Sequence, residues 1–360
     1  MKYQINDKSG RFAYLQLYEQ LRSDIERGVI PFGKKLPSKR LLAEETGTSV
    51  ITVEHAYSIL SDEGYIESRE RSGYFVIYRE KDFITTGKGY VIPSVKSKNQ
   101  PKVKCSFPFT VLSKTIRKVL AEYGEGILVK SPNRGCEELR SAICSYLERS
   151  NGMKVKPSQI VIGSGAEYLY SLVVLLFDTS RTFAIEDPSY EKIRQVYIAN
   201  GVKVDALSLG VDGIKTEELE RTKASVLHVT PFNSFPSGIT ADISKRKEYL
   251  RWAERKKGYI IEDNYDSELT VSRKNEDTMF SLSKDGRVIY MNTFSETIAP
   301  SMRIGYMVIP ETLTEVFENK LGFLSCTVPV LEQYILAELI NSGDFERHIN
   351  RVRRERRKVK

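Results

Sequence analysis

The segment QIVIGSGAEYLYSLVVLLF (159–177) joins a short apolar run to a long apolar run through a glycine-containing turn. Its length and composition predict a buried strand over 159–162, followed at once by a buried helix. A strand that feeds directly into a helix is the unit from which parallel sheets are built. The segment therefore predicts an α/β fold, in which ligands bind at the carboxyl ends of the strands.

The same scheme recurs along the rest of the chain from about residue 105. Each further apolar run ends in small or polar residues before a longer helical pattern, and we expect strands at 182–185, 225–229, 259–261 and 288–291. Strands that alternate with helices favour a mainly parallel sheet. We therefore expect an α/β domain over residues 105–360.

Residues 1–80 have a different pattern. Helix start signals predict a second helix after Ser38 and, beyond a turn at Gly47, a third helix capped by Thr48 or Ser49. A first amphipathic helix precedes them and a two-stranded hairpin follows. This order predicts a winged helix-turn-helix, so the chain is a multi-domain protein, as 360 residues also suggest.

The net charge of +8 is carried by one stretch after the N-terminal part and by the last twenty residues. Residues 1–80 contain 12 basic and 12 acidic residues, whereas 81–104 contain six lysines and one acid, and 341–360 contain eight basic and three acidic residues. The segment 81–104 lacks periodicity and is interpreted as a basic linker. The total charge is therefore weak evidence for a nucleic-acid partner.

Several classes of protein are disfavoured by composition. The apolar run 168–177 is far shorter than the ~20 residues of a membrane span, and the first residues lack a signal-peptide pattern. The cysteines are widely spaced, with no CxxC pair, which argues against a zinc site or a disulfide framework. We expect a cytoplasmic protein with no metal and no membrane partner.

The winged helix predicts binding to double-stranded DNA. Its third helix would enter the major groove, where its first turn presents Ser49, Thr52 and His55 to base edges. Hairpin arginines and the basic residues around the second helix would contact phosphates. Winged helices also serve as protein–protein modules, and the neutral charge of residues 1–80 lends this alternative some weight.

Residues 11–76 resemble the GntR-type winged helix. The resemblance is carried by LPSKR (36–40), TSVITV (48–53), EGY (63–65) and SGYFV (72–76). It implies that an operator is contacted by Lys39, Arg40, Ser49, Thr52, His55, Arg71 and Gly73. The family usually has arginine directly after the helix-starting serine, whereas this chain has Val50.

Four strand ends of the α/β domain carry groups that suit a ligand. They are GSGA (163–166), TPFNSFPSG (230–238), EDNY (262–265), and TFS (293–295) with Arg303 shortly after it. Free amides at a helix start and nearby hydroxyls suit a phosphate, and a carboxylate can pair with a protonated ring nitrogen. Taken singly, a glycine-containing turn of this kind more often serves close packing, and a carboxylate at this place more often caps a helix.

Together these segments resemble fold-type I aminotransferases, and with the winged helix the chain resembles the MocR/GabR regulators. That resemblance implies an aminotransferase-like domain that binds pyridoxal 5'-phosphate. By motif, Gly165 and Ala166 would cradle the phosphate and Asp263 would pair with the pyridine nitrogen. The remaining implied contacts come from Thr293, Ser295 and Arg303 to the phosphate, Asn233 and Tyr265 to the ring hydroxyl, and Tyr190 near the ring.

One departure from that family changes the expected chemistry. The Schiff-base lysine of the family follows Thr-Phe-Ser, and here that position is Glu296. A carboxylate neither captures an aldehyde nor supplies the amine that transamination uses. We therefore expect no catalytic residue, no transamination, and non-covalent binding of pyridoxal 5'-phosphate if it is bound.

Two further departures point the same way. Lys130 stands where the family has a phosphate-binding tyrosine, and the sequence ends at Lys360, where the family continues into a small subdomain that binds the substrate carboxylate. We expect the 105–360 domain to lack this subdomain.

We expect a transcriptional regulator that forms a homodimer and senses a small-molecule effector through its aminotransferase-like domain. The alternatives are a pyridoxal-phosphate-dependent aminotransferase-type enzyme and a truncated, non-functional remnant of a longer regulator.

Overall fold

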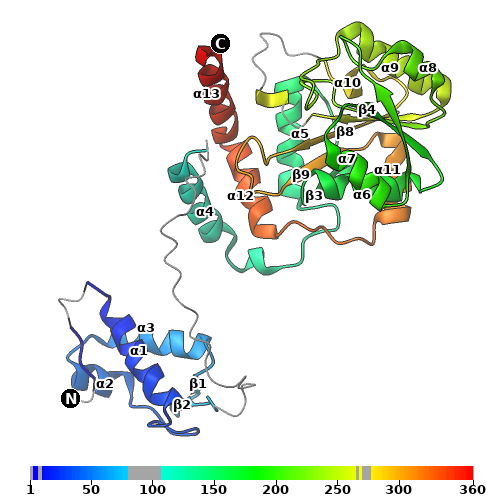
Figure 1. Ribbon diagram of the computed structural model, residues 1–360. Helices are drawn as coiled ribbons and strands as arrows, with labels where there is room; N and C mark the ends of the chain where they lie inside the picture. Colours follow the sequence, from blue (N-terminus) through cyan, green and yellow to red (C-terminus); the bar gives the residue numbers. More distant parts are fainter. Residues whose placement is uncertain (1–2, 7–9, 80–106, 265–266, 270–276, 360) are drawn as a thin grey trace. The chain divides into compact units, whose positions relative to one another are not determined.

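The computed structural model describes residues 3–6, 10–79, 107–264, 267–269 and 277–359 (Figure 1). The chain divides into two compact units, Met1–Gln100 and Pro101–Lys360. The linker expected at 81–104 and the expected ligand contact Tyr265 lie outside the described residues.

The smaller unit is the winged helix-turn-helix that its sequence predicts. Its elements are α1 (Ala13–Glu26), α2 (Lys39–Thr46), α3 (Val50–Asp62), β1 (Ile66–Arg69) and β2 (Gly73–Val76). Ser38 caps α2 by accepting a hydrogen bond from the Leu41 N–H at 3.2 Å. Ser49, rather than Thr48, caps α3.

The core of this unit fixes the angle between α2 and α3. Leu42, Val53 and Tyr57 are fully buried, and the Tyr57 hydroxyl donates a hydrogen bond to the Pro37 carbonyl at 2.9 Å. This bond ties α3 to the loop that begins α2. Leu41 belongs to the apolar run but lies on the outside, with 48% of its surface exposed.

The larger unit is built on one seven-stranded sheet, in the order β3-β9-β8-β7-β6-β4-β5. The five strands from β8 to β5 are parallel, and β9 pairs antiparallel with both β8 and β3, so the expected mainly parallel sheet is confirmed. The strands are β3 (Ile160–Gly163), β4 (Thr182–Asp187), β5 (Lys203–Ser208), β6 (Val226–Val229), β7 (Tyr259–Asp263), β8 (Val288–Thr293) and β9 (Gly305–Val308).

Helices cover both faces of this sheet (Figure 1). Neighbouring residues of a strand pack into different clusters: Ile160 and Ile162 of β3 face α5 and α12, whereas Val161 faces α6 and α11. The helices are α4 (Phe109–Tyr123), α5 (Glu137–Asn151), α6 (Ala166–Phe177), α7 (Glu191–Ala199), α8 (Thr216–Arg221), α9 (Ile243–Lys256), α10 (Met279–Leu282), α11 (Glu311–Leu321), α12 (Val330–Asn341) and α13 (Asp344–Val359). None of these described helices has both the length and the apolar character to span a membrane.

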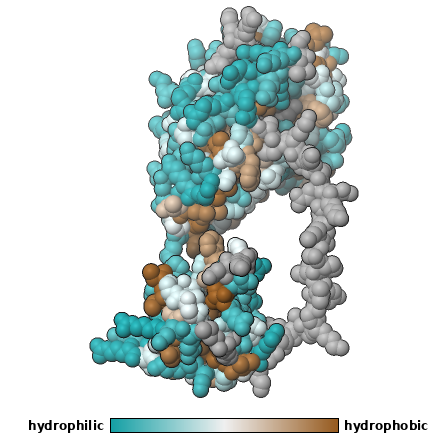
Figure 2. Space-filling model, turned by 90° about the vertical axis from the view of Figure 1, so that its left-hand side faces the viewer, coloured by the Kyte–Doolittle hydropathy of each residue, from teal (hydrophilic) through white to brown (hydrophobic). Residues whose placement is uncertain are grey.

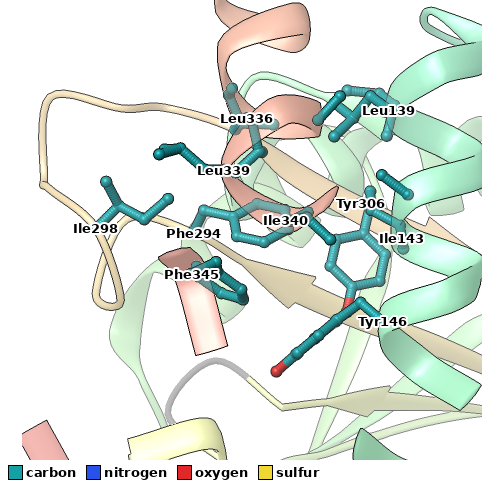
Figure 3. Close-up of a cluster of buried hydrophobic side chains, with 14 of the residues drawn as sticks. Leu139, Ile143, Tyr146, Phe294, Ile298, Tyr306, Leu336, Leu339, Ile340 and Phe345 are labelled. Atoms are coloured by element: carbon teal, nitrogen blue, oxygen red, sulfur yellow. The ribbon is translucent and has the colours of Figure 1, made fainter. Parts of the chain in front are cut away.

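A cluster of buried side chains fixes the segment that follows β8. Figure 3 shows Phe294 among residues of α5, α12 and β9, with Phe345 beside it. The Phe294 ring lies 5.5 Å from Tyr306 and 5.4 Å from Phe345 between centroids. Burial of such a ring stabilises the fold by a few kcal/mol, so Thr293 and Ser295 are held on either side of an anchored residue.

The α4 side of the larger unit is partly apolar. Phe109 is 78% exposed on α4, and Leu128 and Val129, shortly after this helix, are also exposed. Figure 2 faces this side of Figure 1 and shows hydrophobic side chains there among hydrophilic ones. Exposed apolar patches commonly mark surfaces that contact another protein.

Candidate DNA interface and candidate ligand pocket

The start of α3 is built by two hydroxyl groups. The Ser49 Oγ accepts a hydrogen bond from the Thr52 N–H at 3.1 Å and lies 2.9 Å from the Thr52 Oγ1. Ser49 is exposed, and Val50 and Ile51 beside it are 42% and 64% exposed. The first turn of α3 therefore presents two side chains whose hydroxyl groups contact each other and two aliphatic side chains.

The cations near α3 differ in how they are held. Lys39 forms an ion pair with Glu54 of α3 and so joins α2 to α3. Arg40 is exposed and has no ion pair among the residues that the structure describes. His55 is also exposed, with its ring edge 5.6 Å from Tyr14. Arg40 and His55 are therefore better placed than Lys39 to meet an external partner.

The hairpin presents one unpaired guanidinium. Arg69 is occupied, because it pairs with Glu67 at 2.6 Å and lies 4.5 Å from the Phe75 ring centroid. Arg71 is exposed at φ +57° in the turn and has no partner within the described part of the chain. Gly73, at φ +105°, allows the turn, since a Cβ there would lie 3.1 Å from Lys35.

The larger unit contains a cavity of about 360 Å³ at the carboxyl ends of its central strands. It brings together seven positions singled out from the sequence: Ala166, Tyr190, Asp263, Thr293, Ser295, Glu296 and Arg303. Gly165 adjoins it, because a Cβ on this residue would lie 2.9 Å from the Arg303 Nη2. Thr230 and Phe235, from the expected ligand segment 230–238, also line it, and the lining residues that sequence reasoning missed are Glu167, Tyr170 and Ile193.

Asn233 does not line this cavity in the structure. It is exposed at φ +52° in the loop after β6, and its N–H donates a hydrogen bond to the Thr240 Oγ1 at 3.0 Å. Its expected contact with a ring hydroxyl stays a prediction.

A buried network supports Asp263, which is 3% exposed at the end of β7. The Tyr170 hydroxyl donates to its Oδ2 at 2.5 Å, and the His228 Nε2 lies 3.5 Å from the same oxygen. Tyr197 holds the other ring nitrogen of His228 at 2.6 Å. Burial raises the pKa of Tyr170, so its hydroxyl stays protonated and orients the carboxylate.

The helix start of α6 and Arg303 form the other end of the cavity. The Arg303 Nη2 lies 2.5 Å from the Glu167 Oε2, and Lys192 pairs with the Glu167 Oε1 at 2.9 Å. Burial alone would raise the pKa of Glu167, but hydrogen bonds from Lys192, its own backbone N–H and Arg303 hold that pKa below its usual value. The ionised carboxylate of Glu167 is therefore the ion-pair partner of Arg303.

Glu296 faces the cavity without a partner. It is exposed, and no hydrogen bond or ion pair joins it to any other described residue. Lys130 is exposed too but does not line the cavity, and no lysine of the described chain does. The amine that captures an aldehyde in aminotransferases has no counterpart among these lining residues.

The donor set of the cavity fits a phosphorylated pyridine. The amides of Gly165 and Ala166, the hydroxyls of Thr293 and Ser295, and Arg303 would hold the phosphate, and Asp263 would pair with a protonated ring nitrogen. A phosphate bound at the Arg303 Nη2 would displace the Glu167 carboxylate from this nitrogen. The side chain that remains unmatched is Glu296.

Another carboxylate near the cavity makes stability depend on pH. Burial raises the pKa of Glu186 to about 7 and outweighs the hydrogen bonds from Ser234 and the Thr230 backbone. Between pH 4.5, the usual pKa of this group, and about pH 7, the carboxyl keeps its proton in the folded chain. In the unfolded chain it loses its proton over the same pH range. Stability from this group is therefore present below pH 4.5 and is lost as the pH rises through 7.

We expect Glu186→Gln to reduce this loss, because glutamine stays neutral and still accepts the Ser234 hydrogen bond. Urea unfolding of both chains at pH 5 and pH 8 measures it: the decline in unfolding free energy should be smaller by on the order of 1–3 kcal/mol in the variant. An equal decline in both chains would contradict the assignment. Glu262, whose pKa burial also raises to about 7, leaves part of the decline in place.

Comparison with known families matches both units. Residues 13–76 match the bacterial regulatory proteins of the gntR family, and residues 97–360 match aminotransferase class I and II. An uncharacterized HTH-type transcriptional regulator of Bacillus subtilis, YdeL, is 34% identical over 96% of this chain and 77% of its own length. The probable rhizopine catabolism regulatory protein MocR of Rhizobium meliloti is 31% identical over 96% of this chain and 75% of its own.

Solved structures match the larger unit. An archaeal alanine:glyoxylate aminotransferase superposes with a TM-score of 0.62 at 26% identity, over 68% of this chain and 62% of that chain. The Pyrococcus horikoshii kynurenine aminotransferase, in complex with PMP, gives 0.64 at 26% identity, over 69% and 64%. This chain thus spans somewhat less than two thirds of these aminotransferases.

Proposed function

Because this chain belongs to the MocR-like family, in which a GntR winged helix is joined to an aminotransferase class I/II domain, we propose that it regulates transcription by binding an operator. Two relatives that match almost the whole chain are named as uncharacterized HTH-type transcriptional regulators. The observation that carries the proposal is the exposed first turn of α3, in a unit that also exposes Arg40 and the hairpin residue Arg71, neither with an ion pair among the described residues.

In this proposal α3 enters the major groove and the hairpin meets the backbone. Ser49, Thr52 and His55 lie on the first turns of α3 and would meet base edges, with Gly73 allowing the wing its turn. Arg71 and Arg40 would contact phosphates, and Lys39 would mainly orient α2 through Glu54.

Genome-wide recovery of DNA bound to the full chain, with and without pyridoxal 5'-phosphate, tests this function. The expected result is a set of enriched sites that share a sequence, with occupancy that changes when the ligand is added. Absence of any enriched site would contradict operator binding and favour a protein–protein role for the winged helix.

Replacement of Arg71 by alanine should weaken operator binding about equally for all operator sequences. A phosphate contact carries little sequence information, and its loss should reduce the slope of log K against log salt by about 1. Fluorescence anisotropy with operator DNA over a salt series measures this slope. Arg27→Ala removes the same charge from an exposed site at the end of α1 and should leave the slope unchanged; equal effects of both variants would indicate a general charge effect.

The larger unit is proposed to act without transamination. Bound pyridoxal 5'-phosphate supplies an aldehyde that captures amines and a ring that accepts electrons. In this chain Glu296 stands at the position of the capturing lysine, so the ligand would be bound non-covalently by Arg303, Ser295 and Asp263. Absence of keto-acid formation from amino acids in the presence of pyridoxal 5'-phosphate would support this reading, and measurable turnover would favour the enzyme alternative.

We also propose a homodimer that responds to a small-molecule effector. Paired half-sites of an operator require paired winged helices, and the exposed Phe109, Leu128 and Val129 offer an apolar surface for a second copy. A ligand that prefers one arrangement of the pair would change operator affinity by that preference alone. Light scattering of the full chain should give twice the monomer mass, whereas polydisperse aggregates would favour the truncated-remnant alternative.

A further inference from the structure

The charged side chains that line the cavity do not balance one another, as they would if one of them were a lysine. Three carboxylates line it, from Glu167, Asp263 and Glu296, and Arg303 is the one cation among its described lining residues. Arg303 is already paired with Glu167, and Asp263 receives the Tyr170 hydroxyl. Glu296 alone has no partner among the described residues, so the cavity presents an unmatched carboxylate to its ligand.

This carboxylate changes which ligand chemistry the cavity favours. A lysine at this position would be matched by an electrophilic aldehyde, which its amine attacks. A carboxylate is matched instead by a cation with N–H groups, because charge-assisted hydrogen bonds are about twice as strong as neutral ones. An aldehyde oxygen facing Glu296 is a hydrogen-bond acceptor and has no proton to donate.

We infer that the cavity selects a phosphorylated pyridine that carries a primary ammonium group, as pyridoxamine 5'-phosphate does, over its aldehyde counterpart. This inference rests on the proposed ligand site of the larger unit and names its ligand class. The ammonium donates to the Glu296 carboxylate, and the ring nitrogen pairs with Asp263. The amine that is missing from the described lining residues is thus supplied by the ligand.

The phosphate end of the cavity permits this exchange of partners. When a phosphate takes Arg303, Glu167 keeps Lys192, whose Nζ lies 2.9 Å from its Oε1. The displaced carboxylate is therefore not left without a counter-charge. Gly165 leaves the Arg303 guanidinium next to the backbone at the start of α6, since any Cβ there would overlap it.

Isothermal titration of the full chain with three probes tests the inference. The probes are pyridoxamine 5'-phosphate, pyridoxal 5'-phosphate and pyridoxine 5'-phosphate, which share the ring and the phosphate and differ at one substituent: ammonium, aldehyde or neutral hydroxyl. We expect the Kd of the amine to be lower than that of either other probe by about tenfold or more.

The variant Glu296→Gln isolates the carboxylate. It should bring the Kd values of the amine probe and the hydroxyl probe to within about threefold of each other, mainly because the amine probe binds more weakly. Glu220→Gln, an exposed site on α8 away from the cavity, removes the same charge and should preserve the preference. If Glu296→Gln keeps a tenfold preference, or the wild-type chain binds the aldehyde as tightly as the amine, the inference is overturned.

The same protein preparation separates this inference from the proposed function. If none of the three probes binds while operator sites are recovered, ligand selection is overturned and the regulatory function stands. If the amine preference is found but no operator is recovered, the ligand class is supported and the regulatory function fails.

Discussion

Glu296→Lys is expected to give a chain that carries one covalently attached pyridoxal 5'-phosphate, whereas the wild-type chain carries none. The new amine would stand beside Ser295 in the cavity lined by Arg303 and Asp263. A lysine held close to an aldehyde reacts readily, because proximity replaces a second-order encounter. The measurement is intact mass after borohydride reduction, followed by peptide mapping.

A matched control separates the site from general lysine reactivity. Glu220→Lys makes the same charge change on the exposed surface of α8 and should give only the background labelling of the wild-type chain. Stoichiometric labelling of the wild-type chain at one lysine, Lys130 included, would contradict the non-covalent site.

Gly135→Ala is expected to destabilise the larger unit by about 3 kcal/mol or more, because a strained backbone and an overlap add. Gly135 has φ +97°, and a Cβ would lie 2.5 Å from the Ile162 Cγ1 in β3 and 3.0 Å from the Gln333 Oε1. The Gln333 amide cannot move away freely, since it accepts from the Cys136 N–H at 2.7 Å and donates to the Val328 carbonyl at 2.8 Å.

Gly152→Ala is the control for backbone strain alone. Gly152 ends α5 at φ +66°, and a Cβ there would meet nothing within 4 Å. Its cost should stay near 1 kcal/mol, the usual penalty for replacing glycine at a left-handed helix end. Chemical denaturation of both variants gives the difference; equal losses would show that the overlap at Ile162 relaxes.

Much of the fold was predictable from local pattern. The strands β3, β4, β6, β7 and β8 each have an apolar run at their centre or start, and Ser38 and Ser49 are local helix caps. The strands β5 and β9 were missed. Lys203–Ser208 lies at the sheet edge and mixes polar with apolar residues, while Gly305–Val308 is short and owes its place to antiparallel pairing with β3 and β8.

Part of the candidate cavity was also predictable from local sequence pattern. Asp263, Thr293 and Ser295 follow recognisable strands, so their meeting at one sheet edge follows from the parallel order. Tyr170 stands one helical turn after Ala166 and could have been placed on the same face of α6. By contrast, the pairing of Arg303 with Glu167 joins residues far apart in sequence, and no local signal predicts it.

The antiparallel strand β9 has a consequence for how the chain is made. Ile160 of β3 pairs with Val308 of β9, so β3 stays an unpaired edge until almost the whole sheet has been synthesised. The winged helix, by contrast, is complete within the first 80 residues and makes its contacts at short range. Contacts between distant residues form slowly, and domains fold from the N-terminus during translation. The unit that carries α3 is therefore expected to fold on the ribosome before the cavity exists.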